Sequence, residues 1–264
     1  MIIYASQSIL IFCIVVAAVF GAAMGSFLNC AAWRIAHGEE FLKGRSHCPG
    51  CGRELGPAEL VPVLSWLFQR GRCRGCGEKI SVRYPLTELF FALVTALCLY
   101  RFGLTVLCLR NYVFLCCLFC LSLVDLDTMT IPDGAHIISA AAWVIALPFT
   151  FVSWADTGLH VLAGVVFGGG LLLVSLVLDK VLGRESLGGG DIKLVAVTGL
   201  YLGMAGSLFS MMLACIVGIV FYLLLRRRGG EGQAFPFGPS LAFAAGIMLL
   251  FGEPLVRWYT GLLS

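Results

Sequence analysis

Long apolar runs, separated by short polar stretches, dominate the chain along its whole length. Uncharged runs of this kind are typical of helices that cross a lipid bilayer, whose hydrocarbon core is about 30 Å thick. We therefore expect an all-α polytopic membrane protein with about eight transmembrane helices. The pattern places these helices at 8–35, 86–109, 112–127, 136–152, 160–178, 192–206, 208–225 and 239–251.

The longest polar stretch interrupts this pattern after the first span. It suggests three parts: a first transmembrane helix in 1–35, a small polar segment in 36–84, and a transmembrane core in 85–264. Hydrophobic residues make up 59% of the 264 residues and charged residues only 12%, which excludes an ordinary soluble domain.

Lysine and arginine are distributed unevenly between the two sides of the expected bundle. Fifteen of the 18 lie in loops on one side, and nine of these fall within 34–83. Basic residues accumulate on the cytoplasmic side, so the polar segment should be cytoplasmic and both termini should lie outside. The net charge of +3 then reflects membrane topology, and we expect membrane lipid but no nucleic acid as a partner.

Two aspartates lie at the ends of apolar runs that are too short to span a bilayer alone. Asp125 follows the run 112–124, and Asp191 follows the glycines at 188–190 and precedes the run 192–206. As helices these runs are about 20 and 22 Å long, so both acids should dip below the lipid headgroups. Both should also lie at the cytoplasmic face. An acid at that depth is costly and marks a functional site by default.

Two facing carboxylates in a poorly hydrated site cannot both ionise cheaply, so one is expected to keep its proton. Such a pair supplies an acid and a base for peptide hydrolysis by water. Gly188 and Gly190 would let a substrate backbone approach Asp191, because they carry no side chain. The residues alone leave a structural interpretation open, in which Asp191 is a helix N-cap and Asp125 begins a polar turn.

Four cysteines in the polar segment form two Cys-x-x-Cys motifs, Cys48 with Cys51 and Cys73 with Cys76. Two such motifs at this separation are typical of a tetrahedral, four-thiolate zinc site. The segment is too small to bury much core, so a structural Zn²⁺ would supply much of its folding energy. Disulfides and redox-active pairs are weaker alternatives, because the cytoplasm is reducing.

Motifs along nearly the whole chain resemble those of type IV prepilin peptidases, the bifunctional leader peptidases and N-methyltransferases of pilus and type II secretion systems. They occur in the family's order: GSFLN at 25–29, RSHCPGC at 45–51, LVPVLSWL at 60–67, GRCRGC at 71–76, SVRYPLTEL at 81–89, DLD at 125–127, GGGDIKL at 188–194 and PFGP at 236–239.

The resemblance implies that Asp125 and Asp191 are the catalytic pair of an intramembrane aspartyl protease, with Asp191 closing the Gly-x-Gly-Asp motif. It implies cleavage of prepilins or pseudopilins after the glycine that ends a short basic leader, at the cytoplasmic face of the inner membrane. It also implies methylation of the new N-terminal amine by S-adenosylmethionine. The residues alone predict no site for this methyl donor, because no dinucleotide-type motif is present. Asp127 and Asp133 remain alternatives for the first carboxylate.

Glu88 and Lys193 are expected to support the site. Glu88 lies just inside the second span, where it could meet the leader's positive charge or the methylation site, or pair with Arg34 or Arg83. Two other functions compete: a proton-coupled transporter and a zinc-binding membrane scaffold. The position of both acids at one membrane face counts against a proton relay. A peptidase of the same chemistry with a different membrane substrate also stays open.

Overall fold

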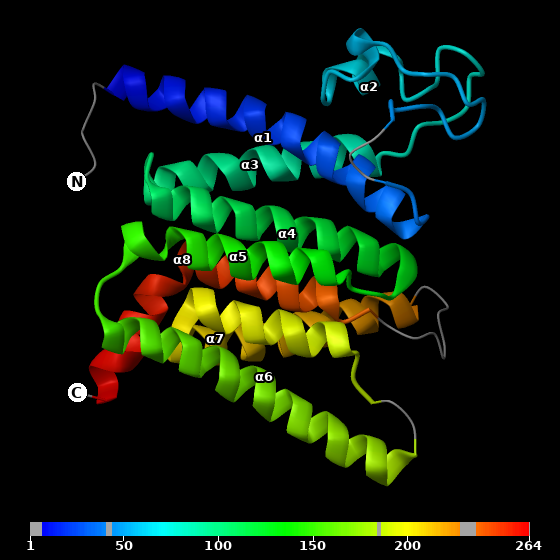
Figure 1. Cartoon of the computed structure of the whole chain (residues 1–264). Helices are drawn as coiled ribbons and strands as arrows, with labels where there is room; N and C mark the ends of the chain where they lie inside the picture. The colour runs from blue at the N-terminus through cyan, green and yellow to red at the C-terminus, as the bar shows by residue number, and fades with distance from the viewer. Residues whose placement is uncertain (1–6, 41–43, 184–185, 228–235, 264) are drawn as a thin grey trace. The chain divides into compact units, whose positions relative to one another are not determined.

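The computed structural model describes all residues except 1–6, 41–43, 184–185, 228–235 and 264, and its regular structure is helical (Figure 1). Within the described residues no strand forms, and extended pairing is limited to two isolated bridges, His47 with Glu54 and Arg72 with Lys79. The all-α prediction is therefore confirmed. The elements are α1 (Gln7–Ala36), the 3₁₀ turn η1 (Pro57–Glu59), α2 (Leu64–Phe68), α3 (Arg83–Phe102), α4 (Val106–Thr128), α5 (Asp133–Thr150), α6 (Trp154–Leu182), α7 (Gly189–Arg227) and α8 (Gly238–Leu263).

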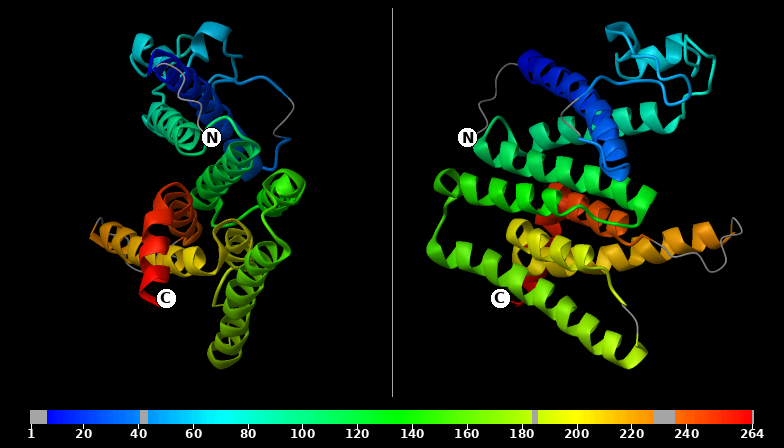
Figure 2. Two further views of the ribbon diagram at one scale, coloured as in Figure 1. Left: turned by 90° about the vertical axis from the view of Figure 1, so that its left-hand side faces the viewer. Right: turned by 45° about the vertical axis from the view of Figure 1, so that its right-hand side comes forward.

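In the described part of the chain, seven helices are long and apolar enough to cross a membrane. Two of the eight expected spans, 192–206 and 208–225, both lie in α7, which is interrupted at Gly203 (φ 65°, ψ −170°). Figures 1 and 2 show the yellow and orange arms of α7 running in opposite directions from this bend. The helix count therefore differs from the expected one because a single residue, rather than a loop, separates the two arms.

The outer faces of these helices carry large apolar side chains. Phe12 on α1 is 68% exposed and Leu173 on α6 is 66% exposed, and many similar residues lie along both helices. Apolar surface of this extent is rare on soluble monomers but is what a lipid-facing helix presents. Together with the helix lengths, it identifies a multi-pass membrane protein.

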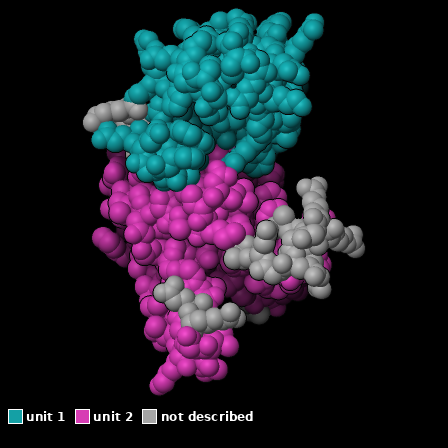
Figure 3. All heavy atoms as spheres, turned by 90° about the vertical axis from the view of Figure 1, so that its right-hand side faces the viewer, with its two compact units in different colours: residues 1–108 teal, residues 109–264 magenta. Residues whose placement is uncertain are grey.

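The chain forms two compact units, residues 1–108 and 109–264, coloured separately in Figure 3. In the first unit, α1 packs closely on α3 because glycines face it. A Cβ atom added at Gly21 would lie 2.6 Å from Thr95 Cβ, and one at Gly25 would lie 3.0 Å from Phe91 Cβ. The polar segment connects these two helices, so their close packing holds both of its ends.

In the second unit, α6 crosses α7 through small residues. A Cβ atom at Gly164 would lie 2.7 Å from the carbonyl oxygen of Ala196, and one at Gly168 would lie 2.6 Å from Ala196 Cβ. Small residues at such crossings let helices in lipid gain close van der Waals contact, which replaces the hydrophobic force available in water.

Tyr201 joins the first arm of α7 to α4 and α5. Its ring stacks on Phe114 of α4 with centroids 4.0 Å apart, and its hydroxyl donates to the carbonyl of Ser139 of α5 at 2.8 Å. The guanidinium of Arg110 lies over the same ring, 5.3 Å from its centroid. These contacts hold the first arm of α7 against α4 and α5. The turn that joins α4 to α5 lies just after Asp125.

The crossing of α6 and α7 yields a stability test. Gly164→Ala should lower the free energy of unfolding by about 1 to 3 kcal/mol, because the added methyl group meets a backbone carbonyl that cannot move aside. Gly170→Ala is the matched control on the same helix, since its Cβ would meet nothing within 4 Å. Both changes alter helix propensity alike. Unfolding titrated with a denaturing detergent measures the difference, and equal midpoints for the two variants would contradict this packing.

Candidate functional site

Asp125 lies in the last turn of α4 and is buried, with 4% of its surface exposed. Its Oδ2 accepts a hydrogen bond from the backbone N–H of Gly238, the first residue of α8, at 3.1 Å. A Cβ atom at position 238 would lie 2.6 Å from this oxygen. The absence of a side chain at Gly238 therefore lets the start of α8 reach the carboxylate.

Asp191 is the third residue of α7 rather than its N-cap. Its backbone N–H donates to the carbonyl of Gly188 at 3.1 Å, so the helical bonding already begins before it. Its Oδ1 is buried and has no hydrogen-bond partner among the residues that the structure describes. Positions 190 and 238 both lie against Ile131, and position 238 also lies against Asp125 Oδ2, so Asp191 begins its helix in the neighbourhood of Asp125. An unpartnered buried acid oxygen costs free energy, and such costs are typical of functional sites.

Ile131, in the turn between α4 and α5, packs against the first residues of both α7 and α8. A Cβ atom at Gly190 would lie 2.7 Å from Ile131 Cβ, and one at Gly238 would lie 2.9 Å from Ile131 Cδ1. A Cβ atom at Gly189, in contrast, would meet nothing within 4 Å. Gly190 is thus needed for helix packing, whereas Gly189 faces open space next to Asp191.

The two alternative acids lie in different surroundings. Asp127 is exposed on the outer side of the last turn of α4. Asp133, at the start of α5, is 65% exposed and accepts a hydrogen bond from Lys193 Nζ at 2.6 Å. Lys193 therefore joins α7 to α5 close to Asp191. Of the three candidate acids, Asp125 is the one that is buried.

Two residues of this site, Gly238 and Ile131, were not predicted as site residues. The PFGP motif at 236–239 marked Gly238 as part of the resemblance, but no local pattern indicates that its N–H would reach an acid 113 residues earlier. Ile131 reads as one apolar residue in a short polar turn.

The four cysteines of the polar segment come together as their spacing predicts. Their sulfur atoms all lie within 4.8 Å of one another, and the Sγ atoms of Cys48 and Cys76 are 3.8 Å apart. Four sulfurs at 2.3 Å from a tetrahedral zinc ion lie about 3.8 Å from each other, so the cluster fits this metal.

The two halves of the cluster have the same backbone bonding. The N–H of Gly52 donates to the carbonyl of Cys48 at 2.8 Å, and that of Gly77 donates to the carbonyl of Cys73 at 2.9 Å. Both glycines have positive φ, 68° and 75°, which glycine adopts at little cost. Each Cys-x-x-Cys-Gly stretch is therefore a tight turn that points two sulfurs to one place.

Electrostatics in the cluster favour a bound cation. The backbone N–H groups of Cys76 and Gly75 lower the pKa of the Cys73 thiol to about 6. Although the N–H of Glu78 stabilises the Cys76 thiolate, burial and the neighbouring sulfurs raise the pKa of Cys76 to about 12. The Cys73 thiolate thus forms easily while the Cys76 thiolate is disfavoured, and a divalent metal removes that restriction.

Glu88 lies in unit 1, on α3, with 6% of its surface exposed. Its Oε2 accepts a hydrogen bond from the backbone N–H of Val63 at 2.7 Å. Glu88 therefore lies, as expected, within a helix that is long and apolar enough to span a membrane. The hydrogen-bond donor to its carboxylate is a backbone N–H of the polar segment. Arg34 is also buried, and one of its guanidinium nitrogens donates to the carbonyl of Arg45 at 3.2 Å.

Comparison with known proteins yields two family matches. Residues 19–102 match the Bacterial Peptidase A24 N-terminal domain, and residues 112–223 match the Type IV leader peptidase family. No solved structure gives a significant match.

Curated relatives match over most of the chain. A protein of Bacillus subtilis (strain 168) is 34% identical over 250 residues, which cover 91% of this chain and 95% of the relative. One from Pseudomonas putida is 33% identical over 266 residues, covering 92% of each, and one from Myxococcus xanthus (strain DK1622) is 37% identical over 216 residues, covering 80% of this chain and 64% of the relative. All three are named "Prepilin leader peptidase/N-methyltransferase". The chain therefore belongs to the type IV leader peptidase family.

Proposed function

We propose that this enzyme removes the leader from type IV prepilins and pseudopilins and then methylates the new N-terminal amine. The observation that carries the peptidase proposal is the buried Asp125 at the end of α4, close to the start of α7, where the buried Oδ1 of Asp191 has no partner among the described residues. The names of the relatives support both activities. Membership of a peptidase family favours this function over a transporter or a scaffold.

In the proposed reaction, Asp125 and Asp191 share one proton. The charged carboxylate takes a proton from a water molecule, whose oxygen forms a bond to the peptide carbonyl carbon. The protonated carboxyl donates to the carbonyl oxygen, and the C–N bond then breaks as the leaving nitrogen takes up a proton. The open space beside Gly189 would admit the substrate backbone next to Asp191.

The site is proposed to lie at the cytoplasmic face. Asp125 ends α4 and Asp133 begins α5, so both lie at one end of that helix pair. The reversal of α7 at Gly203 returns the chain to the same end before α8 begins at Gly238. Most basic residues belong to loops of this side, which supports a cytoplasmic placement with both termini outside.

We also propose that the metal is zinc, held by Cys48, Cys51, Cys73 and Cys76. When bound, zinc supplies a four-way cross-link in a segment with little core of its own. S-adenosylmethionine is the proposed methyl donor. Its chemistry would be the transfer of a methyl group from a sulfonium to an amine.

Replacing either carboxyl group by an amide of the same shape tests the carboxyl pair. Asp125→Asn and Asp191→Asn should each slow leader removal by at least about a thousandfold, because neither amide can exchange the required proton. Methylation of a pre-cleaved peptide should continue in both variants. Asp127→Asn, on the same turn of α4, is the matched control and should remain active. Mass spectrometry of a prepilin peptide follows both reactions, and cleavage by both site variants would refute the mechanism.

The glycines before Asp191 give a steric test. Gly190→Ala should reduce leader removal by about 10- to 100-fold, because the new methyl group meets Ile131 and displaces Asp191. Gly189→Ala adds the same group into open space and should stay close to native activity.

The double variant Gly190→Ala with Ile131→Ala provides the rescue arm of this test. Removing the Ile131 side chain makes room for the new methyl group, so part of the lost activity should return. Equal activity of Gly189→Ala and Gly190→Ala, or no rescue, would show that the contact does not position Asp191.

Metal content tests the cysteine cluster. Purified protein should contain about one zinc ion per chain by elemental analysis. Cys73→Ser should lose the metal and loosen the polar segment, measured as faster proteolysis within 36–84. Cys13→Ser, on α1 and outside the cluster, is the control and should retain zinc. Full zinc content in Cys73→Ser would contradict the four-thiolate site.

A further inference from the structure

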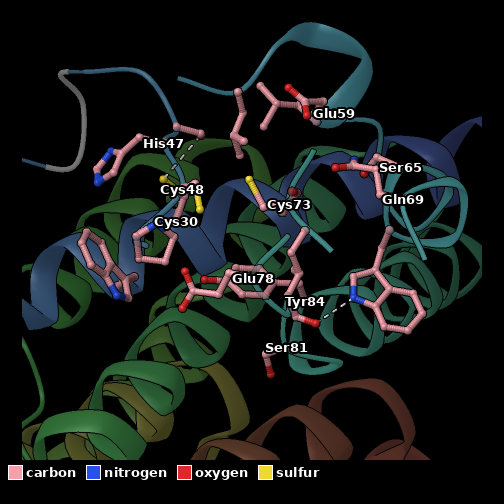
Figure 4. A pocket seen from close by; sticks show the side chains of 18 of the residues that line it. Cys30, His47, Cys48, Glu59, Ser65, Gln69, Cys73, Glu78, Ser81 and Tyr84 are labelled. Carbon is pink, nitrogen blue, oxygen red and sulfur yellow. Dashed lines mark hydrogen bonds between the residues drawn. The ribbon is translucent and has the colours of Figure 1, made fainter. Parts of the chain in front are cut away.

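A cavity of about 370 Å³ lies within unit 1, lined by α1, the polar segment and α3 (Figure 4). Its size falls in the range of small-molecule sites, about 300 to 1,000 Å³. Its lining combines aromatic rings, carboxylates and a guanidinium, and it includes Cys48 and Cys73 of the cysteine cluster. The carboxyl pair Asp125 and Asp191 belongs to the other unit, and neither residue lines this cavity.

A buried carboxylate lines this cavity. Glu88 is 6% exposed, and the bond that it accepts from Val63 holds an unusual turn. Val63 has φ 61° and ψ −52°, and the N–H of Leu64 donates to the carbonyl of Pro62 at 2.6 Å. This conformation is strained for a β-branched residue, and strain of this kind is typically kept at ligand sites. A buried negative charge at such a place suits a positively charged ligand.

Two tryptophan rings in the lining are held in fixed positions. Trp66 Nε1 donates to the carbonyl of Ile80 at 3.1 Å, and Gly71 lies so close that a Cβ atom there would be 2.8 Å from the Trp66 ring. Trp33 stacks on His37 with centroids 4.1 Å apart. Fixed aromatic faces are suited to stacking on a planar heterocycle such as a purine.

Arg34 adds a buried positive charge to the same lining. It is 6% exposed, and its guanidinium donates to the Arg45 carbonyl, which orients it. A cavity that offers a carboxylate, a guanidinium and two rings is complementary to a ligand with a cation, a carboxylate and a purine. Figure 4 shows labelled polar side chains around the cavity, including Glu78, Ser81 and Tyr84.

We infer that this cavity binds S-adenosylmethionine, an inference that rests on the proposed methyl transfer. Glu88 would face the positive sulfonium or amino group, Arg34 the carboxylate, and Trp33 or Trp66 the adenine. In the transfer, the acceptor nitrogen forms a bond to the methyl carbon as the C–S bond breaks. The electron pair of that bond stays on sulfur, and the amine proton leaves to water. A bare N-terminal amine would account for Glu88 but not for the two rings and Arg34.

Photolabelling locates the donor without relying on a variant. Purified full-length protein is irradiated with 8-azido-S-adenosylmethionine, and labelled peptides are identified by mass spectrometry. We expect the label within residues 26–88, and we expect excess S-adenosylhomocysteine to prevent it. Label within 109–264, or label that S-adenosylhomocysteine does not reduce, would overturn the inference.

Glu88→Gln tests the charge, because its amide oxygen can still accept the Val63 N–H. The dissociation constant for S-adenosylmethionine, from calorimetry, and the KM for this donor should each rise about tenfold or more. Glu54→Gln is the matched control: Glu54 is 63% exposed, pairs with Arg45 and lies outside the cavity lining. Zinc content is compared to establish that both variants are folded.

The outcomes separate this inference from the proposed function. If Glu88→Gln binds the donor normally and instead loses leader removal, Glu88 acts on the leader and the inference is wrong. If the native protein methylates a pre-cleaved peptide but is labelled outside the cavity, the cavity assignment alone fails. If it removes leaders and transfers no methyl group, the proposed methyltransferase function fails as well.

Discussion

The site of Asp125 and Asp191 depends on close contact between three chain segments: the turn that contains Ile131, the start of α7 and the start of α8. Two glycines make this contact possible. Gly190 lets the start of α7 meet Ile131, and Gly238 lets the start of α8 meet both Ile131 and Asp125. In lipid there is little hydrophobic force between helices, so association depends on close van der Waals contact and on hydrogen bonds. The same principle governs the crossing of α6 and α7 at Gly164, which means that small residues build both the bundle and the site within it.

Features that depend on residues close in sequence were predictable. The apolar runs indicated the helices, because a bilayer requires a minimum length of uncharged helix. The cysteine cluster could be predicted from its two short motifs, since each Cys-x-x-Cys turn positions two sulfurs locally. The structure differs from the sequence prediction in the number of helices, because a single residue determines it. Gly203 divides α7 without a loop, and no apolar pattern distinguishes such a bend from two separate helices.

Features that depend on which face of a helix turns inward were not predictable from pattern alone. Asp125 and Asp127 are two residues apart on α4, yet one is buried and the other exposed. A helix that is apolar on all sides gives no periodic signal for its inner face. The choice of Asp125 came from the resemblance to a family. The hydrogen bond from Gly238 adds a physical reason, because it shows which side of α4 meets the start of α8.

The two units stabilise polar groups in different ways. In unit 2 the start of α8 brings the backbone N–H of Gly238 to Asp125 inside an apolar bundle. In unit 1 the polar segment contains only a few turns of helix, so it cannot bury a core of its own. Its cavity is instead bounded on one side by α1 and α3 and on another by Cys48 and Cys73 of the cluster. A metal that holds those sulfurs would therefore also hold a wall of the cavity. This would give a small, polar segment the rigidity that a binding site requires.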